Sequence, residues 1–446
     1  MNSRLVLCAI TSALAGFIFG FDTVVISGAE QKIQGLWELT PQRHGWAMSA
    51  ALWGTVLGAI LGSVPTDNYG RRPTLIWVGL LYFVSAIWSG LAIGPWDFSV
   101  ARFIGGVGIG IATVAAPLYI AEISPPRLRG RLTGLFQFNI VFGILMAYVS
   151  NALLQDISEH DWRWMLGVEA IPAAIYSAMA LLLPESPRWL MSQRGDRPAA
   201  AGVMASLSPG LTEREIQSQL DAIEADGAAA SNIDAGQPNR LLQPLTIAFL
   251  VAMFNQFSGI NAILYFSPRI FEEAGFGERA TTLNTVGIGL TNLVATMLGL
   301  WLIDRAGRRA LLLVGSVGYI ASLGLCSWGF ASGHTEIVPW CIFAFIASHA
   351  IGQGAVIWVL ISEVFPNRSR ALGQSVGSAT HWVFAALITA LFPVAASTFP
   401  QWQIFAFFCG AMVLQLIWVL FFVPETKNVP LERMSETLAA RRPAEA

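Results

Sequence analysis

Residues 67–72 read DNYGRR and residues 304–309 read DRAGRR, so one charged hexapeptide occurs twice, 237 residues apart. Two further motifs repeat at nearly the same spacing. Glu122, one residue ahead of SPPRLRG, returns 241 residues later as Glu363, one residue ahead of FPNRSRA, and PES at 184–186 returns 240 residues later as PET at 424–426. Three motifs at nearly one spacing predict two homologous halves related as a parallel repeat.

The composition around these motifs is that of a membrane protein. The 446-residue chain is 54% hydrophobic and only 12% charged, with a mean hydropathy of +0.58, which differs from soluble domains. A bilayer-spanning helix needs about 20 apolar residues. The sequence therefore predicts an all-α membrane protein with about twelve spans, at residues 5–28, 46–64, 73–93, 97–122, 130–154, 164–183, 243–274, 280–303, 310–332, 337–363, 371–396 and 401–422.

A polar interval separates the two sets of six spans and predicts the domain boundary. Within it, EREIQSQLDAIEAD indicates a short amphipathic helix. The predicted parts are an N-terminal six-helix domain over 1–183, a cytoplasmic helical linker over 184–242, a C-terminal six-helix domain over 243–423 and a cytoplasmic tail over 424–446.

The distribution of basic residues predicts the orientation in the membrane. Placing both termini in the cytoplasm puts about 20 of the 26 Lys and Arg residues inside and about 5 outside, as the positive-inside rule requires. The apolar run after Arg4 continues past Gly20 without a cleavage site, so we expect the first span to be retained.

Several functional classes lack their usual signals here. The net charge of −2 says nothing about partners, but no basic arm or nucleic-acid motif is present, so a nucleic-acid partner is not expected. The four cysteines lie in apolar runs without disulfide or metal spacing; they are Cys8, Cys326, Cys341 and Cys409. Neither a nucleophile–base pair nor a nucleotide-binding loop is visible, so we expect no catalytic residues, no cofactor and no metal.

Carboxamides within the hydrophobic segments point to a polar ligand. Residues 255–266 read NQFSGINAILYF, and Asn292 lies in the next apolar segment. An amide inside a bilayer is costly unless it is satisfied, so these residues are candidate ligand contacts or interhelical bonds. Uncharged groups that both donate and accept hydrogen bonds suit a ligand made of hydroxyls, which indicates a sugar.

Three ionisable residues lie deep in predicted spans. Asp22 is in the first, Arg102 in the fourth and Glu169 in the sixth. One reading is a static Asp22–Arg102 pair that packs two helices, although an apolar pair would usually serve that purpose as well. The other is a proton site, because an acid beside a buried cation titrates when its partner moves away.

These motifs resemble those of the major facilitator superfamily and, more narrowly, its sugar porter family. The resemblance rests on DNYGRR, DRAGRR, PESPRWL after the sixth span, NQFSGIN in the seventh and PETK after the twelfth, and it extends over essentially the whole chain. It implies two pseudo-symmetric six-helix domains that transport a sugar by alternating access. It also implies proton coupling through Asp22, Arg102 and Glu169.

The resemblance also implies the residues that bind substrate. They are Phe19, Gln137, Asn255, Gln256, Asn261, Tyr265, Asn292, Gly354, Trp358, His381 and Trp382. The sequence departs from the family pattern at Asn255, where a Gln is common, and at His381, where Asn or Gln is usual. GQGAVIW lacks the prolines of many relatives, so flexibility there would rest on Gly352 and Gly354. His349 and His381 are either extra proton sites or hydrogen-bonded packing residues.

The repeated charged motifs are expected at the cytoplasmic ends of the helices. One reading is topology alone; the family resemblance implies ion pairs across the two halves that form a cytoplasmic gate. Asn68 and Ser63 depart from the usual first motif, so we expect a looser first-half gate. The gate residues are Asp67, Arg71, Arg72, Glu122, Arg129, Glu185, Asp304, Arg308, Arg309, Glu363, Arg370 and Glu425.

The function predicted from these features is proton-coupled symport of a monosaccharide, a hexose or pentose such as glucose or xylose, across a bacterial inner membrane. A facilitative uniporter without proton coupling is the alternative of the same class. A sugar sensor that does not transport is the alternative of another class, and it would normally carry a long signalling tail. The partners expected are the sugar, protons and the lipid bilayer. The oligomeric state is left open, and a monomer suffices.

Overall fold

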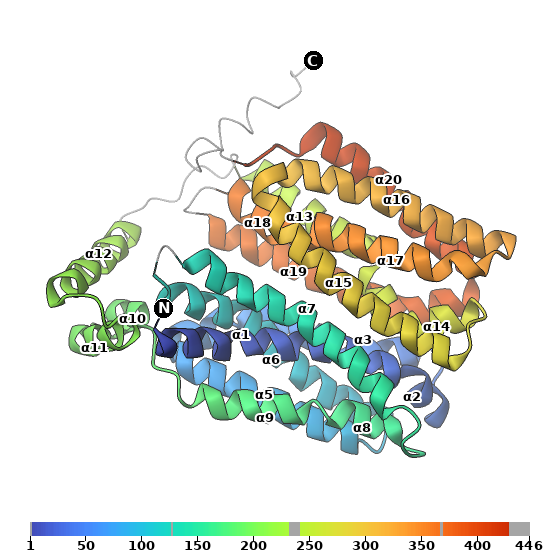
Figure 1. Cartoon of the computed structure of the whole chain (residues 1–446), viewed down its shortest axis with the longest axis horizontal. Helices are drawn as coiled ribbons and strands as arrows, with labels where there is room; N and C mark the ends of the chain where they lie inside the picture. The colour runs from blue at the N-terminus through green and yellow to red at the C-terminus, as the bar shows by residue number, and fades with distance from the viewer. Residues whose placement is uncertain (1, 126–127, 232–240, 366–368, 428–446) are drawn as a thin grey trace. The chain divides into compact units, whose positions relative to one another are not determined.

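The computed structural model describes residues 2–125, 128–231, 241–365 and 369–427, and these residues form helices and no strands. The elements are α1 (Ser3–Val25), η1 (Ile26–Gly28), α2 (Glu30–Leu36), α3 (Pro41–Leu61), α4 (Ser63–Asn68), α5 (Arg71–Leu91), α6 (Pro95–Ile123), α7 (Arg129–Leu154), α8 (Asp161–Gly167), α9 (Ala170–Ala180), α10 (Pro187–Trp189), η2 (Leu190–Arg194), α11 (Arg197–Leu207), α12 (Glu213–Ser231), α13 (Leu242–Phe257), α14 (Ile260–Glu273), α15 (Glu278–Ala306), α16 (Arg308–Ser332), η4 (Thr335–Ile337), α17 (Val338–His349), η5 (Ala350–Gly354), α18 (Ala355–Val364), α19 (Arg370–Thr398) and α20 (Gln401–Phe422). Figure 1 labels most of them.

The predicted all-helical membrane fold is confirmed. Within the described residues, ten helical stretches are long and apolar enough to cross a membrane. The remaining two predicted spans correspond to α3 and to the interrupted pair α8 and α9. Every predicted span thus coincides with one helix or with two or three consecutive helices.

The chain folds into two compact units. Unit 1 contains Met1–Thr23, Trp53–Ile144 and Arg163–Ala235, and unit 2 contains Val24–Leu52, Leu145–Trp162 and Gly236–Ala446. Two segments of the first sequence half, 24–52 and 145–162, therefore group with the second half. The predicted domain boundaries 1–183 and 243–423 follow the repeat in sequence and stay a prediction.

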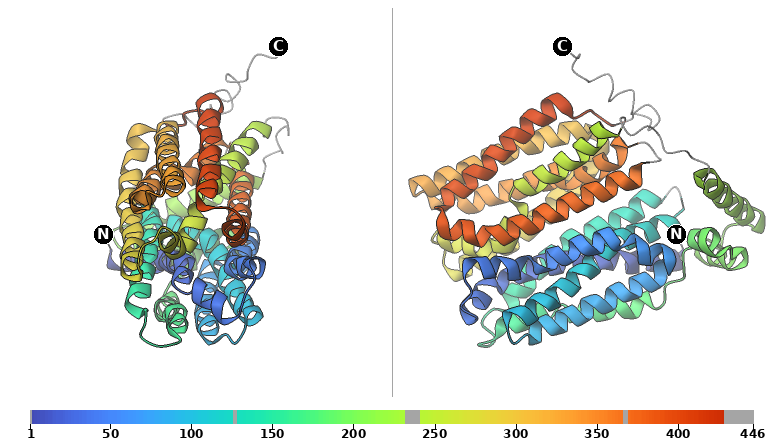
Figure 2. Two further views of the ribbon diagram at one scale, coloured as in Figure 1. Left: turned by 90° about the vertical axis from the view of Figure 1, so that its right-hand side faces the viewer. Right: turned by 180° about the vertical axis from the view of Figure 1, so that it is seen from behind.

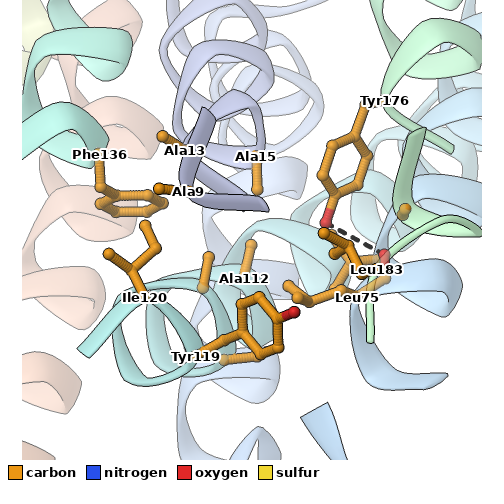
Figure 3. Close-up of a cluster of buried hydrophobic side chains, with 14 of the residues drawn as sticks. Ala9, Ala13, Ala15, Leu75, Ala112, Tyr119, Ile120, Phe136, Tyr176 and Leu183 are labelled. Atoms are coloured by element: carbon orange, nitrogen blue, oxygen red, sulfur yellow. Dashed lines mark hydrogen bonds between the residues drawn. The ribbon is translucent and has the colours of Figure 1, made fainter. Parts of the chain in front are cut away.

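Unit 1 packs around small and aromatic side chains. Ala9, Ala13 and Ala112 are fully buried, which lets neighbouring helices approach closely, as is common in membrane bundles. Two of the three tyrosines at this core hydrogen-bond through their hydroxyls: Tyr176 donates to the Leu75 carbonyl at 3.1 Å, as Figure 3 shows, and Tyr119 donates to the Pro184 carbonyl at 2.8 Å. The hydroxyl of the third, Tyr82, is buried and has no hydrogen-bond partner among the described residues.

The linker helices belong to unit 1. In Figure 1, α10, α11 and α12 lie beyond the N-terminal end of α1. Asn2 donates to the carbonyls of Ser206 and Leu207 at 2.9 and 3.0 Å, which ties the end of α11 to the start of the chain. α12 covers the predicted amphipathic stretch. Residues 232–240 of the predicted linker and 428–446 of the predicted tail lie outside the described residues.

In unit 2, α16 packs against α17 and α20, and α13 packs against α19; the view from behind in Figure 2 shows α13, α19 and α20. The seventh predicted span is discontinuous. α13 ends at Phe257, and Gly259 takes a left-handed conformation with φ +86° before α14 begins. A Cβ on Gly259 would lie 2.7 Å from the Phe408 ring, so a glycine is required there. The break falls within NQFSGIN.

Candidate functional site

The first arginine of DNYGRR is held by partners from its own half. Arg71 donates from Nε and Nη2 to the two carboxylate oxygens of Glu122, each at 2.9 Å, and from Nη1 to the Thr66 carbonyl at 3.1 Å. Asp67 lies 3.3 Å from Nη1. The paired, parallel bonds to Glu122 need the planar fork of an arginine. This motif therefore joins α4, α5 and α6.

The acid of the PES motif caps the helix that follows DNYG. The Glu185 carboxylate accepts the backbone N–H of Arg71 at 2.9 Å and that of Arg72 at 3.3 Å. Gly70 has φ +103°, and a Cβ on it would lie 2.3 Å from Glu185 Oε2. A glycine is therefore needed both for the turn and for the approach of the carboxylate to the helix N-terminus, where a negative charge is favoured.

The second half repeats this arrangement. Arg308 donates to both carboxylate oxygens of Glu363 at 2.9 and 3.0 Å and to the Ile303 carbonyl at 3.0 Å, and Asp304 lies 3.3 Å away. Glu425 of the PET motif accepts the N–H of Arg308 at 2.9 Å, while Gly307 has φ +91°. The repeat predicted from sequence spacing is thus also a repeat of bonds.

The second arginine of each motif has a different role from the first. Arg72 donates to the Leu181 carbonyl at 2.9 Å and Arg309 to the Leu420 carbonyl at 2.6 Å. Both carbonyls lie at helix C-terminal ends, where a cation is favourable. The predicted gate residues Arg129 and Arg370 begin α7 and α19, and their side chains lie outside the described residues.

The two capping acids differ in their electrostatics. Burial raises the pKa of Glu185, and the backbone N–H groups of Ser186 and of the two arginines only partly oppose it. At Glu425 burial acts in the same direction, but the N–H groups of Lys427 and its neighbours outweigh it and lower the pKa. Because hydrogen bonds to a carboxylate favour its charged form, the second cap is the more firmly ionised.

The three deep ionisable residues meet in unit 1. Arg102 on α6 binds Asp22 on α1 through Nη1 to Oδ1, through Nη2 to Oδ2 at 3.1 Å, and through Nη2 to the Asp22 carbonyl at 3.0 Å. Glu169, which precedes α9, interacts electrostatically with Asp22 and Arg102. All three are 2% exposed. One cation and two acids are therefore buried together in unit 1.

The amides of the discontinuous seventh span form one bonded group in unit 2. Gln256 Nε2 donates to Asn255 Oδ1 at 3.0 Å and lies 3.3 Å from the ring nitrogens of His381 on α19. Asn261 Nδ2, just past the break at Gly259, donates to Gln256 Oε1 at 2.7 Å. Asn255 and His381, the two departures from the family pattern, are therefore the partners of Gln256.

Aromatic rings flank these amides. The Trp358 ring on α18 lies 5.1 Å from the His381 ring, which in turn meets Trp382 edge-on at 4.8 Å. Trp358 and His381 are half-buried, while Trp382 is buried. Rings beside amides provide apolar faces and hydrogen bonds together, which is how polar ligand pockets are commonly lined.

The other predicted binding residues lie on further elements of the two units, and the hydrogen bonds described for Gln256 do not reach them. In unit 2, Asn292 on α15 accepts a bond from Thr296 at 3.4 Å, Tyr265 is buried on α14, and Gly354 closes the π-helix η5. Phe19 and Gln137 are half-buried residues of unit 1, on α1 and α7.

His349 and a pair of glutamines form two further polar contacts in unit 2. The Tyr319 hydroxyl lies 2.8 Å from His349 Nδ1, as expected of a hydrogen-bonded packing residue. Gln353 in η5 donates to Gln415 at 2.6 Å, and Gln415 donates to Ser316 at 2.9 Å. Gln353 and Gln415 are not among the residues predicted from the sequence. An amide within an apolar helix is the sequence feature that could have indicated them. In the described part of the chain, no group of three His, Cys, Asp or Glu side chains is arranged for a metal.

Comparison with known proteins gives consistent matches over the whole chain. A family model described as sugar (and other) transporter matches residues 8–438. The glucose transport protein of Synechocystis is 35% identical, covering 95% of each chain. The arabinose-proton symporter of Bacillus subtilis is 32% identical, covering 97% of this chain and 94% of that one. The partially occluded inward-open structure of the xylose transporter XylE from E. coli matches with a TM-score of 0.86 at 27% identity, covering 96% of this chain and 100% of that one.

Proposed function

Because this chain belongs to the sugar porter family of the major facilitator superfamily, we propose that it carries a monosaccharide across the bacterial inner membrane together with a proton. In this proposal both termini are cytoplasmic, as the distribution of basic residues favours. The substrate is a hexose or pentose, in keeping with the glucose, arabinose and xylose named for its relatives.

The observation that carries proton coupling is the buried group of Asp22, Arg102 and Glu169. One cation and two acids, each 2% exposed, lie in one buried site, where Arg102 binds Asp22 and Glu169 interacts with both. Leaving a charge unpaired in such a site costs several kcal/mol, so the occupancy of the proton and the position of Arg102 are linked. A proton on Asp22 compensates for the withdrawal of Arg102, and the return of Arg102 expels that proton.

The transport cycle follows from this exchange. Asp22 takes a proton from the outer solution when Arg102 separates from it, and sugar binding then promotes closure of the outer side. Arg102 returns after the inner side opens, and Asp22 releases the proton to the cytoplasm. Each inward-moving charge adds about 2.3 kcal/mol per 100 mV of membrane potential to the driving force for accumulation.

The amide group of unit 2 supports a sugar as the ligand. The Gln256 amide donates to one neighbour and accepts from another, so it is suited to a hydroxyl that also does both. Its partners in the free protein are themselves amides and an imidazole, so a hydroxyl can replace any of them without leaving a charge unpaired. The ring of Trp358 supplies an apolar face for the sugar.

The decisive experiment is uptake of labelled glucose and xylose into proteoliposomes with an imposed pH gradient, with and without a protonophore. Accumulation above the outside concentration that collapses with the protonophore supports symport. Uptake that only equilibrates and ignores the protonophore would make the protein a facilitative uniporter. Binding without any uptake or counterflow would instead favour a sensor.

A further inference from the structure

A buried charged cluster lies outside the sites described above. Glu30 on α2 and His44 on α3 are both 0% exposed, and His44 Nε2 lies 2.7 Å from Glu30 Oε2. Arg269 on α14 donates from Nε to Glu30 Oε1 at 3.1 Å and from Nη2 to Glu30 Oε2 at 2.8 Å. Arg269 also binds Gln34 Oε1 at 2.5 Å. All four residues belong to unit 2.

The bonds define the charge state of this cluster. Arg269 binds both oxygens of Glu30, as it would a carboxylate, so one positive and one negative charge cancel. His44 Nε2 must then carry the hydrogen that Glu30 Oε2 accepts. His44 Nδ1 is buried and has no hydrogen-bond partner in the described part of the chain. A proton on Nδ1 would add an unpaired charge, so the closed cluster holds His44 neutral.

Further charged groups surround the cluster. Glu272 and Glu273 follow Arg269 on α14 and interact with it. Gln31 on α2 donates to Glu272 at 3.0 Å, and Gln401 at the start of α20 bonds Glu273. Lys32 on α2 binds Asp161 on α8 at 2.5 Å and lies 3.9 Å from Asp156. Glu272, Glu273 and Asp161 thus have hydrogen-bond partners of their own. Arg269 is the cation that neutralises the buried Glu30 carboxylate.

The cluster contacts the seventh span next to an irregular part of its backbone. Phe266 has non-helical torsion angles inside α14, and Pro268 interrupts the backbone bonds one residue before Arg269. The His44 ring packs edge-on to Phe266 at 6.2 Å. Asn261 lies eight residues before Arg269, about 12 Å along a helix. The segment that carries a proposed sugar contact therefore also carries the cation that holds α2 and α3.

The cluster lies at the end of unit 2 opposite Arg308. α15 begins five residues after α14 ends and finishes just before Arg308, so Arg269 and Arg308 are at opposite ends of that helix. If the arginine motifs face the cytoplasm, the cluster faces the outside. The inference that follows rests on this orientation and on the proposed transport function.

We propose that Glu30, His44 and Arg269 form a proton-sensitive outer latch: Arg269 holds the outer side closed, and a proton on the Glu30–His44 pair replaces it when α14 moves away. In the closed state the pair is neutralised by Arg269. In the open state the neutral imidazole takes one proton from the outer solution and becomes the cation that pairs with Glu30. Closure returns Arg269 and releases the proton to the same side.

The direction of the pH effect follows from this balance. Opening binds one proton, so acid outside favours the open latch and alkaline solution favours the closed one. The ratio of open to closed molecules changes by up to about tenfold per pH unit in the range where the pair titrates. No proton crosses the membrane at this site, so the latch sets access and leaves the coupling ratio unchanged.

The test is a distance measurement on the full chain in lipid nanodiscs. Spin labels are placed at Leu36→Cys on α2 and Arg279→Cys on α15, after the four native cysteines are replaced by serine. Both label sites are exposed. Electron–electron double resonance then records the distance distribution between about pH 5 and about pH 8, where histidine titrates. We expect a long-distance population that grows as the pH falls.

Two variants and one control separate the latch from other titrating groups. Arg269→Gln should keep the long-distance population high at every pH, because the closed state loses its cation. His44→Gln still donates to Glu30 but takes up no proton, so the long-distance population should no longer grow between about pH 8 and about pH 5. His334→Gln removes an exposed histidine of unit 2, which lies 3.2 Å from Glu336, and should leave the pH response of the wild type unchanged.

The latch proposal is overturned if Arg269→Gln retains the closed population of the wild type, or if His44→Gln leaves the midpoint unchanged. Thermal unfolding of the same samples, followed by tryptophan fluorescence, verifies that each variant is folded. Uptake in proteoliposomes is scored separately: a pH-dependent latch in a protein that neither binds nor moves sugar would refute the proposed function and leave the latch standing.

Discussion

Glu185 accepts a hydrogen bond from the backbone N–H of Arg71 at 2.9 Å, so the acid of one motif caps the helix that begins with another, 114 residues earlier in the chain. The same relation holds between Glu425 and Arg308. In each half, a free backbone N–H group at the start of the helix after the glycine turn therefore donates to a carboxylate. That carboxylate belongs to the segment after the sixth span of the same half.

We expect Arg71→Lys to destabilise the protein more than Arg72→Lys. Arg71 makes two bonds to Glu122 and one to a carbonyl, and a lysine cannot reproduce this planar pattern. The loss should be about 1–3 kcal/mol of unfolding free energy. Arg72 makes a single side-chain bond to a carbonyl, which an ammonium can replace. Thermal unfolding of both purified variants tests the difference, and equal losses would contradict it.

The two capping acids should respond to pH with opposite signs. The pKa of Glu425 is lowered, so its stabilisation is present above the ordinary value of 4.5 and is lost as the pH falls through the lower value of the folded protein. The pKa of Glu185 is raised, so the folded protein binds this proton more readily than the unfolded chain. The wild type should then gain stability relative to Glu185→Gln as the pH falls from neutral.

Melting temperatures of wild type, Glu185→Gln and Glu425→Gln across this pH range provide the measurement. The gap between wild type and Glu425→Gln should narrow in acid. The melting temperature of the wild type should instead rise relative to that of Glu185→Gln as the pH falls. Parallel curves for the two variants would show that the caps are electrostatically equivalent.

Gln256→Ala and Trp358→Ala should each weaken sugar binding. Removing the Gln256 amide leaves Asn261 and the sugar hydroxyl without a partner, at a cost of about 1–3 kcal/mol, which corresponds to roughly a five- to 150-fold higher Kd. Gln374→Ala is the control and should leave the Kd unchanged. It also removes an amide beside Trp358, but this amide bonds a backbone carbonyl, at 3.3 Å, and is not a predicted sugar contact. Calorimetry on purified protein measures the three constants. Unchanged binding in the first two variants would show that the sugar binds elsewhere.

Asp22→Asn should separate binding from accumulation. The amide resembles the protonated acid in shape and charge but cannot release a proton, so gradient-driven accumulation should disappear. Sugar binding should remain, and so should exchange of labelled for unlabelled sugar, which needs no net proton movement. If the variant accumulates sugar as the wild type does, Asp22 is a structural partner of Arg102.

Gly259→Ala should disturb the break in the seventh span. A side chain there would need φ +86° and would meet the Phe408 ring at 2.7 Å, at a cost of about 1–2 kcal/mol for the backbone alone. Because the break places Asn261 against Gln256, sugar affinity should fall with stability. Gly277→Ala is the matched control, since Gly277 has φ −68° and open space around it. Equal behaviour of the two variants would contradict this account of the break.

The helices, their number and the internal repeat were predictable from the sequence because each depends on local properties. An apolar run partitions into the bilayer whatever surrounds it, and arginines near span ends report orientation in the same way. The pairing of Asp22 with Arg102 was also predictable, since a buried acid needs a cation and Arg102 was the available one.

Partners that come from distant segments were decided by the tertiary structure alone. The sequence marked Asn255 and His381 as departures from the family pattern, but only the packing of α13 against α19 brings both to Gln256. The arginines of each motif were expected to pair across the two halves, and the bonds found for Arg71 and Arg308 lie within one half.

The Glu30 cluster shows the same limit most clearly. Each of its residues lies near a span end, where a charged side chain is ordinary, and His44 and Arg269 are 225 residues apart in sequence. Nothing local distinguishes them from solvated residues. Only the fold removes water from Glu30, and a carboxylate without water must take its hydrogen bonds from whichever donors the packing places beside it.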